Sequence, residues 1–565
     1  MRDWQEGRDL LESNQSTSRL SRLSRASRTT ARGAGGLFQH PDRKAHRMNC
    51  SMHGCFPSLV TVALLGITLI LLPLGSHGFA QSEEDHRAWL RALDGLSGEH
   101  MLADVTTLSS PAFNGRQTGT TDDADSAKWV ADRFLDSGLS LASVRIDPIS
   151  SARQGRGYGE GYMTAAVTVP KIAPNPVLHI STAGDSLTHQ PGTDYLPILD
   201  SPSAAVRGPI VFVGYGIVDR AQGINDYDGV DTTNAIVLFL RGKPTYYKGA
   251  ISHADKVRLA RQRGALGYLT ATGPVLSSYE GRRGVTGQPG AFYGLSPSSD
   301  TIPGAWISTA LAEQILSTPD HAQPSRLHGL HENLNLSPAA QSVSTGQYGS
   351  LAWQARAEEG VLMNVLAFLP GSDPQKTHEV LVIGAHRDHF GQQAGLLFPG
   401  ADDNASGTAV MLEIARAMSK AGARGTRTIL FVSFSGEEQG LVGSRLYIER
   451  PVAPIGSTKA MINIDHAGIG NGRLTIGVTG FEKNLALEAG QAVGLTEKLD
   501  LFGFFPGGDH VPFKEAGVPT VTVVSSGVHP HFHQPTDNAD TVNKDILLVA
   551  ARYVLALAWT LAGDR

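Results

Sequence analysis

Short apolar runs alternate with helical patterns through the last third of the chain, and this alternation constrains the fold more than any other feature. The runs lie at residues 380–383, 428–434, 460–464 and 518–524. They are short and rich in β-branched and large apolar residues, which is typical of strands covered on both faces. Residues 406–421 carry apolar side chains on one side of a helix. The pattern predicts an α/β fold with a mixed, largely parallel sheet flanked by helices.

Most of these runs are followed directly by side chains that can bind metals. The residues are His386 and Asp388 after the first run, Glu437 and Glu438 after the second, Asp465 after the third, and His529, His531, His533 and Asp537 after the fourth. The loop before the helix adds Asp402 and Asp403. Ligands of such sheets collect beyond the carboxyl ends of the strands, so we expect these side chains to converge at one edge.

Carboxylates and imidazoles without thiolates are a ligand set that suits Zn²⁺ and similar ions. Several carboxylates crowded into one site repel one another unless cations lie between them. Two ions about 3.5–4 Å apart, sharing one carboxylate, would relieve that repulsion. The residues therefore predict a metal site, and they suggest a pair of ions.

The length and charge of the chain limit the classes of function. A chain of 565 residues exceeds one compact core, so we expect at least two domains. The formal net charge of −5 gives no electrostatic reason to bind nucleic acid, and we predict no nucleic-acid partner.

The first 80 residues differ from the rest of the chain. Residues 1–55 include an Arg- and Ser-rich stretch that cannot build a core, and we predict a disordered extension. Residues 56–80 combine an apolar run with small residues at the end, which predicts a signal peptide cleaved after Ala80. The alternative is an uncleaved membrane anchor formed by residues 56–74. We expect an exported protein, periplasmic or secreted, with no stable membrane partner beyond this segment.

Two further regions lie between the leader and the metal-binding motifs. Residues 83–190 begin with helical patterns, such as 124–135, which ends at Gly138. Residues 194–346 contain β runs at 210–213 and 235–240, each bounded by turn residues. This texture predicts a separate β-rich domain.

The motifs after residue 361 closely resemble those of the M28 family of metallopeptidases, the dinuclear zinc aminopeptidases. The matching stretches are His386-Arg387-Asp388 and residues 400–407, 437–444, 463–465 and 532–537. The resemblance implies a zinc exopeptidase fold, with residues 350–565 as the main catalytic domain and residues 83–190 as its N-terminal part. Residues 194–346 resemble a protease-associated insert domain, notably at 214–216, 226–228 and 240–242.

The resemblance also implies the roles of individual residues. One of two zinc ions per chain would bind His386, Asp403 and Asp465, and the other would bind Asp403, Glu438 and His533. Counting back from Ser406-Gly407 aligns Asp403 with the family residue that bridges the two metals, and Asp402 is the alternative. The family's Tyr-His pattern, here Phe-His, selects His533 over His529 and His531. Asp388 would accept a hydrogen bond from the His386 ring, and Glu437 would be the general base for the water that bridges the metals.

The implied activity is removal of N-terminal residues from peptides, which makes peptides the expected partners. A glutamate-carboxypeptidase-like exopeptidase is an alternative, but it would need arginines to bind the terminal carboxylate. A glutaminyl-cyclase-like transferase is less favoured because those relatives hold one metal and this chain keeps five ligands. The non-enzyme alternative is a receptor-like ectodomain or binding module on the same scaffold, in which we would expect some metal-binding residues to be replaced. The oligomeric state does not follow from the sequence.

Three residues near these motifs have open roles. Asp537 could orient His533 or cap a turn. His466 could donate to the site or simply pack, and we favour packing. Arg116 could pair with a carboxylate near the site or support the fold, and we favour the fold.

Overall fold

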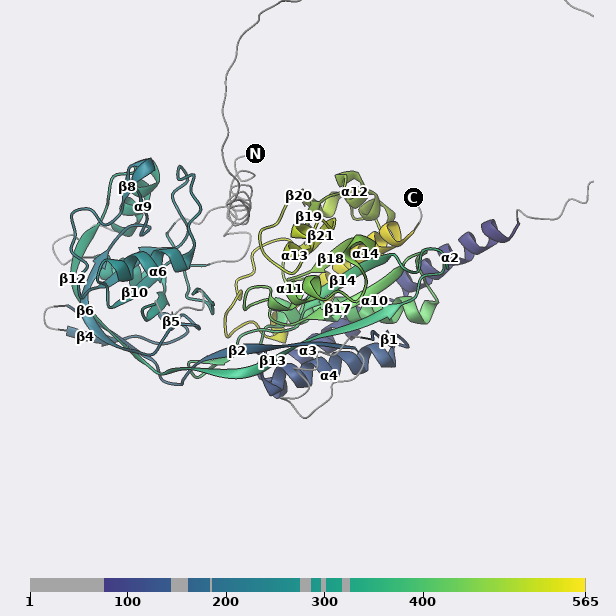
Figure 1. Ribbon diagram of the computed structural model, residues 1–565, viewed down its shortest axis with the longest axis horizontal. Coiled ribbons are helices and arrows are strands. Elements are labelled where there is room, and N and C mark those ends of the chain that lie inside the picture. Colours follow the sequence, from purple (N-terminus) through teal and green to yellow (C-terminus); the bar gives the residue numbers. More distant parts are fainter. Residues whose placement is uncertain are drawn as a thin grey trace, which may run out of the picture.

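The computed structural model describes residues 76–143, 161–182, 185–274, 286–295, 301–317 and 326–563. The predicted disordered extension and most of the predicted leader therefore lie outside the described residues. The described part forms two bodies joined by a long pair of strands (Figure 1).

The larger body is built on a nine-stranded sheet with the order β1-β13-β17-β14-β18-β21-β19-β20, in which β2 also pairs with β13. Its strands are β1 (Ser140–Leu141), β2 (Tyr162–Ile172), β13 (Ala355–Leu369), β14 (Val380–His386), β17 (Thr428–Phe434), β18 (Thr458–Ile464), β19 (Leu474–Thr479), β20 (Leu499–Phe502) and β21 (Thr520–Ser525).

The sheet is parallel in its centre and antiparallel on both sides. β17, β14, β18 and β21 run parallel to one another, and β19 runs parallel to β20. The pairings of β13 with β1, β2 and β17, and of β19 with β21, are antiparallel. The sheet is mixed, as predicted, but the parallel part is smaller than "largely parallel" implies.

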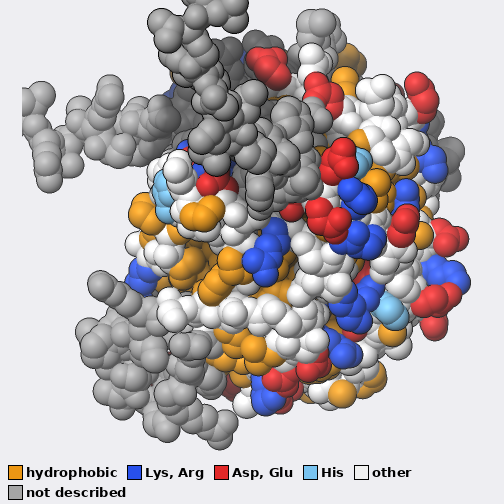
Figure 2. Space-filling model, turned by 90° about the vertical axis from the view of Figure 1, so that its right-hand side faces the viewer, with side chains coloured by type: hydrophobic (Ala, Val, Ile, Leu, Met, Phe, Trp, Pro, Cys, Tyr) orange, Lys and Arg blue, Asp and Glu red, His pale blue; other side chains and the backbone are white. Residues whose placement is uncertain are grey.

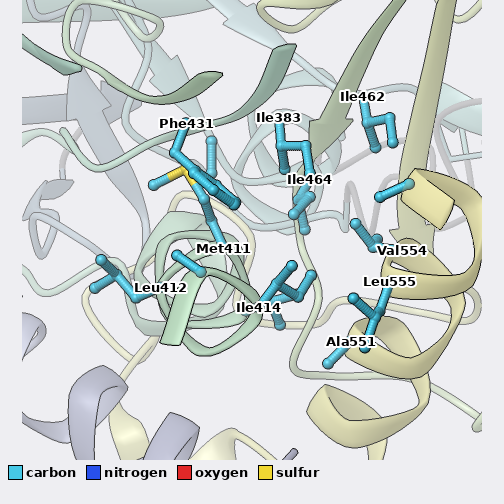
Figure 3. Packing of buried hydrophobic residues seen from close by; sticks show 14 of the residues in the cluster. Ile383, Met411, Leu412, Ile414, Phe431, Ile462, Ile464, Ala551, Val554 and Leu555 are labelled. Carbon is cyan, nitrogen blue, oxygen red and sulfur yellow. The ribbon is translucent and has the colours of Figure 1, made fainter. Parts of the chain in front are cut away.

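Helices cover both faces of this sheet because successive strand residues point to opposite sides. Ile383 packs into the cluster on one face, while Val382 packs into the cluster on the other. The first face is covered by α2 (Ser76–Asp94), α3 (Gly98–Leu108), α4 (Thr121–Asp136), α10 (Gly407–Ala421), α12 (Lys483–Ala492) and α14 (Lys544–Ala562). The second face is covered by α11 (Val442–Glu449) and α13 (His510–Glu515). Figure 3 shows strand residues meeting α10 and α14 in the first cluster.

Among the described residues, α14 is the helix long and apolar enough to cross a membrane by length and composition. The most apolar window of α14 is 61% buried inside the protein, as in a core helix. On the face seen in Figure 2, acidic and basic side chains are intermingled over the described residues.

The smaller body contains an eight-stranded sheet with the order β4-β3-β12-β6-β9-β10-β11-β5. Its strands are β3 (Val177–Thr182), β4 (Asp185–Thr188), β5 (Tyr195–Pro197), β6 (Ala204–Phe212), β9 (Ile236–Leu240), β10 (Gly267–Ala271), β11 (Gly304–Ile307) and β12 (Val343–Trp353). Its helices are α6 (His253–Gln262), α8 (Thr309–Leu316) and α9 (Arg326–Leu336). This sheet spans a wider range than the 194–346 expected from sequence.

The two bodies are linked by β2 and β13, which pair antiparallel from Ala355–Ile172 to Val365–Tyr162. A hairpin of the larger body, β15 (Gly391–Gln393) and β16 (Leu396–Phe398), also packs on the smaller one. Phe390 and Phe398 belong to the same buried cluster as Tyr195 and Leu196. The smaller body is therefore held beside the strand ends where the predicted ligands lie.

Candidate metal centre

The central parallel strands bring the predicted ligands to one edge of the sheet. His386 is the last residue of β14, Asp465 directly follows β18, and Glu438 lies four residues beyond the end of β17. His533 comes from the loop after β21, and Asp403 from the turn before α10. Since β17, β14, β18 and β21 are neighbours, their carboxyl ends lie side by side.

The five predicted ligands form two groups that share Asp403. In the first group, Nε2 of His386 lies 3.3 Å from Oδ1 of Asp465 and 3.4 Å from Oδ1 of Asp403. In the second group, Nε2 of His533 lies 3.2 Å from Oδ2 of Asp403 and 3.5 Å from Oε2 of Glu438. Asp403 thus faces each group with a different oxygen.

Hydrogen bonds of the two imidazoles define which nitrogen of each ring carries a hydrogen. Nδ1 of His533 lies 2.9 Å from the backbone oxygen of Ala291, and Nδ1 of His386 lies 3.2 Å from that of Asp388. A carbonyl only accepts, so each Nδ1 donates, and in the neutral ring Nε2 presents a lone pair. With both rings neutral and the carboxylates ionised, each lone pair faces two oxygens that only accept.

That arrangement is repulsive unless a cation lies between the groups, and its dimensions fit zinc. Ligand atoms around a tetrahedral zinc ion with bonds of about 2.0–2.2 Å lie about 3.3 to 3.6 Å apart. The distances of 3.2 to 3.5 Å within the two groups are close to that spacing. The residues present therefore fit a pair of zinc ions.

The charge balance of the site points the same way. Burial, together with the neighbouring carboxylate of Asp465, raises the pKa of Glu437 to about 8. Burial and the carboxylate of Asp403 raise the pKa of Glu438 well above its usual value. Divalent cations would favour the charged forms of both groups.

Asp402 and the other two histidines of the last loop contact groups outside the five predicted ligands. The carboxylate of Asp402 accepts from the backbone N–H groups of Gly468 and Ile469 at 2.8 and 3.0 Å, and from Nδ1 of His529 at 2.5 Å. His531 pairs with Thr536. Of the alternatives left open by the sequence, Asp403 and His533 are thus the ones that face the other ligands.

Asp388 and Asp537 both support the site through the backbone. The Asp388 carboxylate lies 3.7 Å from Nδ1 of His386, farther than the Asp388 backbone oxygen, so the predicted bond to the ring goes to the backbone instead. The carboxylate of Asp388 accepts from the hydroxyl of Thr118 at 2.8 Å and from the N–H of Glu437 at 3.3 Å.

Asp537 accepts from the N–H groups of Asp402 and Asp403 at 2.9 and 3.1 Å. It therefore anchors the turn that carries Asp403.

Two further histidines contact the site, one that the sequence analysis did not consider and one for which it favoured packing. His389 was not singled out, yet its Nδ1 lies 2.7 Å from Oε1 of Glu438, which leaves Oε2 facing His533. The expectation that His466 only packs is wrong, because its two nitrogens lie 3.4 Å from Asp402 and 3.7 Å from Asp403. Their only sequence signal is adjacency, since His389 follows Asp388 and His466 follows Asp465.

The two arginines nearest the motifs are fully buried and bonded to the protein. Arg116 donates to the backbone oxygens of Arg387, Pro399 and Gly400 at 2.6 to 2.7 Å. It supports the fold, as expected. Arg387 pairs with Asp123 at 2.6 Å and donates to the backbone oxygen of Met363 at 2.6 Å.

The sequence and the fold are similar to those of known peptidases. Residues 364–558 match the model of peptidase family M28. A probable leucine aminopeptidase of Arthroderma otae is 30% identical over 212 residues, covering 35% of this chain and 57% of the relative. A probable glutamate carboxypeptidase of Arabidopsis thaliana, AMP1, is 28% identical over 429 residues, covering 67% of this chain and 56% of that relative. The chain thus spans little more than half the length of these curated relatives.

The fold resembles that of solved structures. The structure of an aminopeptidase from Aneurinibacillus sp. strain AM-1 aligns with a TM-score of 0.58 at 22% identity. The alignment covers 85% of this chain and 97% of that one, so it includes most of both bodies described above.

Proposed function

We propose that this chain, whose residues 364–558 belong to peptidase family M28, is an exported zinc-dependent exopeptidase that removes N-terminal residues from peptides. One observation supports the proposal above the others. Two imidazole Nε2 atoms each face two carboxylate oxygens, and Asp403 is common to both groups.

Two zinc ions are the cofactors that this set would hold. One would bind His386, Asp403 and Asp465, and the other would bind Asp403, Glu438 and His533. When bound, the ions would supply Lewis-acid polarisation of the scissile carbonyl and would lower the pKa of a water molecule in the site.

Glu437 is the proposed general base. Its carboxylate lies in one group with His386 and Asp465, with their ligand atoms all within 4.8 Å of one another. Glu437 directly precedes Glu438 in the bend and turn after β17, and the carboxylate of Glu438 faces His533 instead. Glu437 takes the proton of the attacking water and passes it to the leaving amine.

The buried contacts of Arg116 and Arg387 favour an aminopeptidase over a carboxypeptidase. A carboxypeptidase needs a cation for the terminal carboxylate, and arginine provides it best. Arg116 and Arg387 are both occupied by buried protein groups, so neither is available to a substrate. The Arabidopsis relative is named a probable glutamate carboxypeptidase, which keeps that activity as the second candidate.

A comparison of blocked and unblocked substrates separates the candidates. We expect hydrolysis of leucine p-nitroanilide, loss of that activity with a chelator, and no hydrolysis of N-acetyl-leucine p-nitroanilide. A peptide with a blocked N-terminus and a free C-terminal glutamate is the matching carboxypeptidase substrate. Cleavage of this peptide without cleavage of the anilide would reject the aminopeptidase.

The leader and the smaller body belong to the same proposal. We propose that residues 56–80 export the chain and are removed after Ala80, which N-terminal sequencing of the exported protein would test. We propose that the smaller body is a protease-associated insert domain. The receptor-like alternative is not favoured, because all five ligand residues are present.

A further inference from the structure

A segment of the smaller body contacts the proposed ligand His533 directly. The backbone N–H of Ala291 donates to the backbone oxygen of His533 at 2.9 Å, and Nδ1 of His533 donates to the backbone oxygen of Ala291 at 2.9 Å. The side chain of Gln534 adds a bond from Nε2 to the backbone oxygen of Pro289 at 2.8 Å. We call residues 287–295 the docking segment.

The docking segment is anchored firmly in the smaller body. The carboxylate of Asp200 accepts from the N–H groups of Gly294 and Leu295 at 3.0 and 2.8 Å. The N–H of Leu199 donates to the backbone oxygen of Phe292 at 3.0 Å, and that of Thr309 donates to Gly287 at 2.7 Å. The segment therefore moves with the smaller body.

Aromatic contacts extend the same interface towards the metal centre. The hydroxyl of Tyr293 lies 3.1 Å from Nε2 of Gln117, and the Tyr293 ring packs against Phe390 with centroids 5.5 Å apart. Phe390 in turn meets the ring of His533 edge-on with centroids 4.7 Å apart. The His533 ring is thus held on one side by Phe390 and at Nδ1 by Ala291.

The corresponding contact of the other imidazole comes from the larger body itself. Nδ1 of His386 donates to the backbone oxygen of Asp388, two residues away. The two halves of the centre therefore differ in what orients their histidine. Nδ1 of His386 is held by the loop that follows β14, whereas Nδ1 of His533 is held by the docking segment.

We propose that the docking segment is a positioning element for the second metal position, and that docking of the smaller body and cation binding at His533 and Glu438 stabilise each other. The inference rests on the two-ion centre of the proposed function. Ala291 holds the hydrogen on Nδ1 and points Nε2 at Asp403 and Glu438, as outer-shell partners of ligand histidines do. Because the coupling of two binding equilibria is reciprocal, loosening the docking segment weakens binding of the ion. Removing the ion in turn weakens docking of the segment.

Two variants loosen the contact without changing a ligand. A Cβ on Gly290 would lie 3.3 Å from Cβ of His533 and 3.4 Å from its backbone oxygen, so Gly290→Val pushes the segment away. Gln534→Ala removes the bond to Pro289. Gln288→Ala is the matched control, since Gln288 is an exposed residue of the same segment.

The readout is the affinity of the full chain for Zn²⁺, measured by competition with a chelating dye. In both variants we expect one zinc equivalent to bind about 10-fold more weakly, the usual effect of losing an outer-shell partner, while the other keeps its wild-type affinity. The control should keep both affinities. Metal-free unfolding midpoints, recorded in parallel, separate this effect from a general loss of stability.

Wild-type affinity for both equivalents in both variants would overturn the inference. So would equal weakening of both equivalents, because a merely structural contact has no preference for one position, and so would a wild-type chain that binds a single equivalent. Peptidase activity is not part of this readout. A wild-type chain that binds two equivalents but cleaves no peptide would reject the proposed function and leave the affinity comparison intact.

Discussion

Replacement of Arg387 by methionine tests how the loop that carries His386 and Asp388 is supported. The Arg387 guanidinium is fully buried and lies 2.6 Å from the carboxylate of Asp123, which is also fully buried. Arg387→Met would leave that carboxylate without its cation. Removing one partner of a buried ion pair costs roughly 3–5 kcal/mol in the free energy of unfolding.

A surface arginine gives the matched control. Arg445 pairs with Glu515 at 2.9 Å, with side chains that are 47% and 37% exposed. Exposed pairs contribute about 0–1 kcal/mol, so Arg445→Met should change the unfolding free energy by no more than that. Urea unfolding of the metal-free chains, followed by circular dichroism, measures both variants.

The cost of Arg387→Met should depend on pH. Burial raises the pKa of Asp123 to about 6, although Arg387 lowers it, so loss of Arg387 raises this pKa further. A carboxyl group whose pKa is higher in the folded state than in the unfolded state stabilises the fold at low pH and loses that contribution as the pH rises. The variant should therefore be closer to wild type at pH 5 than at pH 8.

One result would refute this reasoning. If Arg387→Met unfolds like the surface control at both pH values, the guanidinium is not a structural partner of Asp123. A change confined to the KM for peptides with a free C-terminus would then indicate that Arg387 binds a substrate carboxylate. That result would favour the carboxypeptidase alternative over the aminopeptidase proposal.

The remaining predictions concern the metal centre. Glu437→Gln should keep two zinc ions per chain by elemental analysis while kcat/KM falls by about 10²- to 10⁴-fold; equal activity would remove Glu437 from its role. Glu438→Ala should lower the zinc content, and unchanged zinc content would exclude it as a ligand. His389→Ala should weaken one zinc equivalent about 10-fold, since His389 holds Oε1 of Glu438. Zinc at 100 times its Kd should stabilise the chain by about 2.7 kcal/mol for each ion bound, relative to the chelated form, and an unchanged unfolding midpoint would argue against binding.

The sequence was most informative where a local pattern determines geometry. Apolar runs end directly at His386 and Asp465, and parallel neighbours place such ends together, so the edge that carries the ligands could be predicted. The choice of Asp403 over Asp402 needed the family resemblance. Chemistry alone does not distinguish adjacent aspartates, whereas the structure turns Asp402 towards Gly468 and His529.

The features that escaped prediction depend on contacts between distant parts of the chain. β3 lies outside the expected insert, and it joins the second sheet by pairing with β12, more than 150 residues later. The antiparallel pairing of β2 with β13 is equally remote in sequence. The hydrogen bonds between Ala291 and His533 join residues 242 positions apart, and no residue type signals them.

Anomalous X-ray scattering at the zinc edge, from crystals of the zinc-loaded chain, tests the central claim most directly. The account predicts two peaks on either side of the Asp403 carboxylate, one bonded to His386 and Asp465 and the other to Glu438 and His533. A single peak, or a peak held by Asp402 and His529 with none at Asp403, would contradict it.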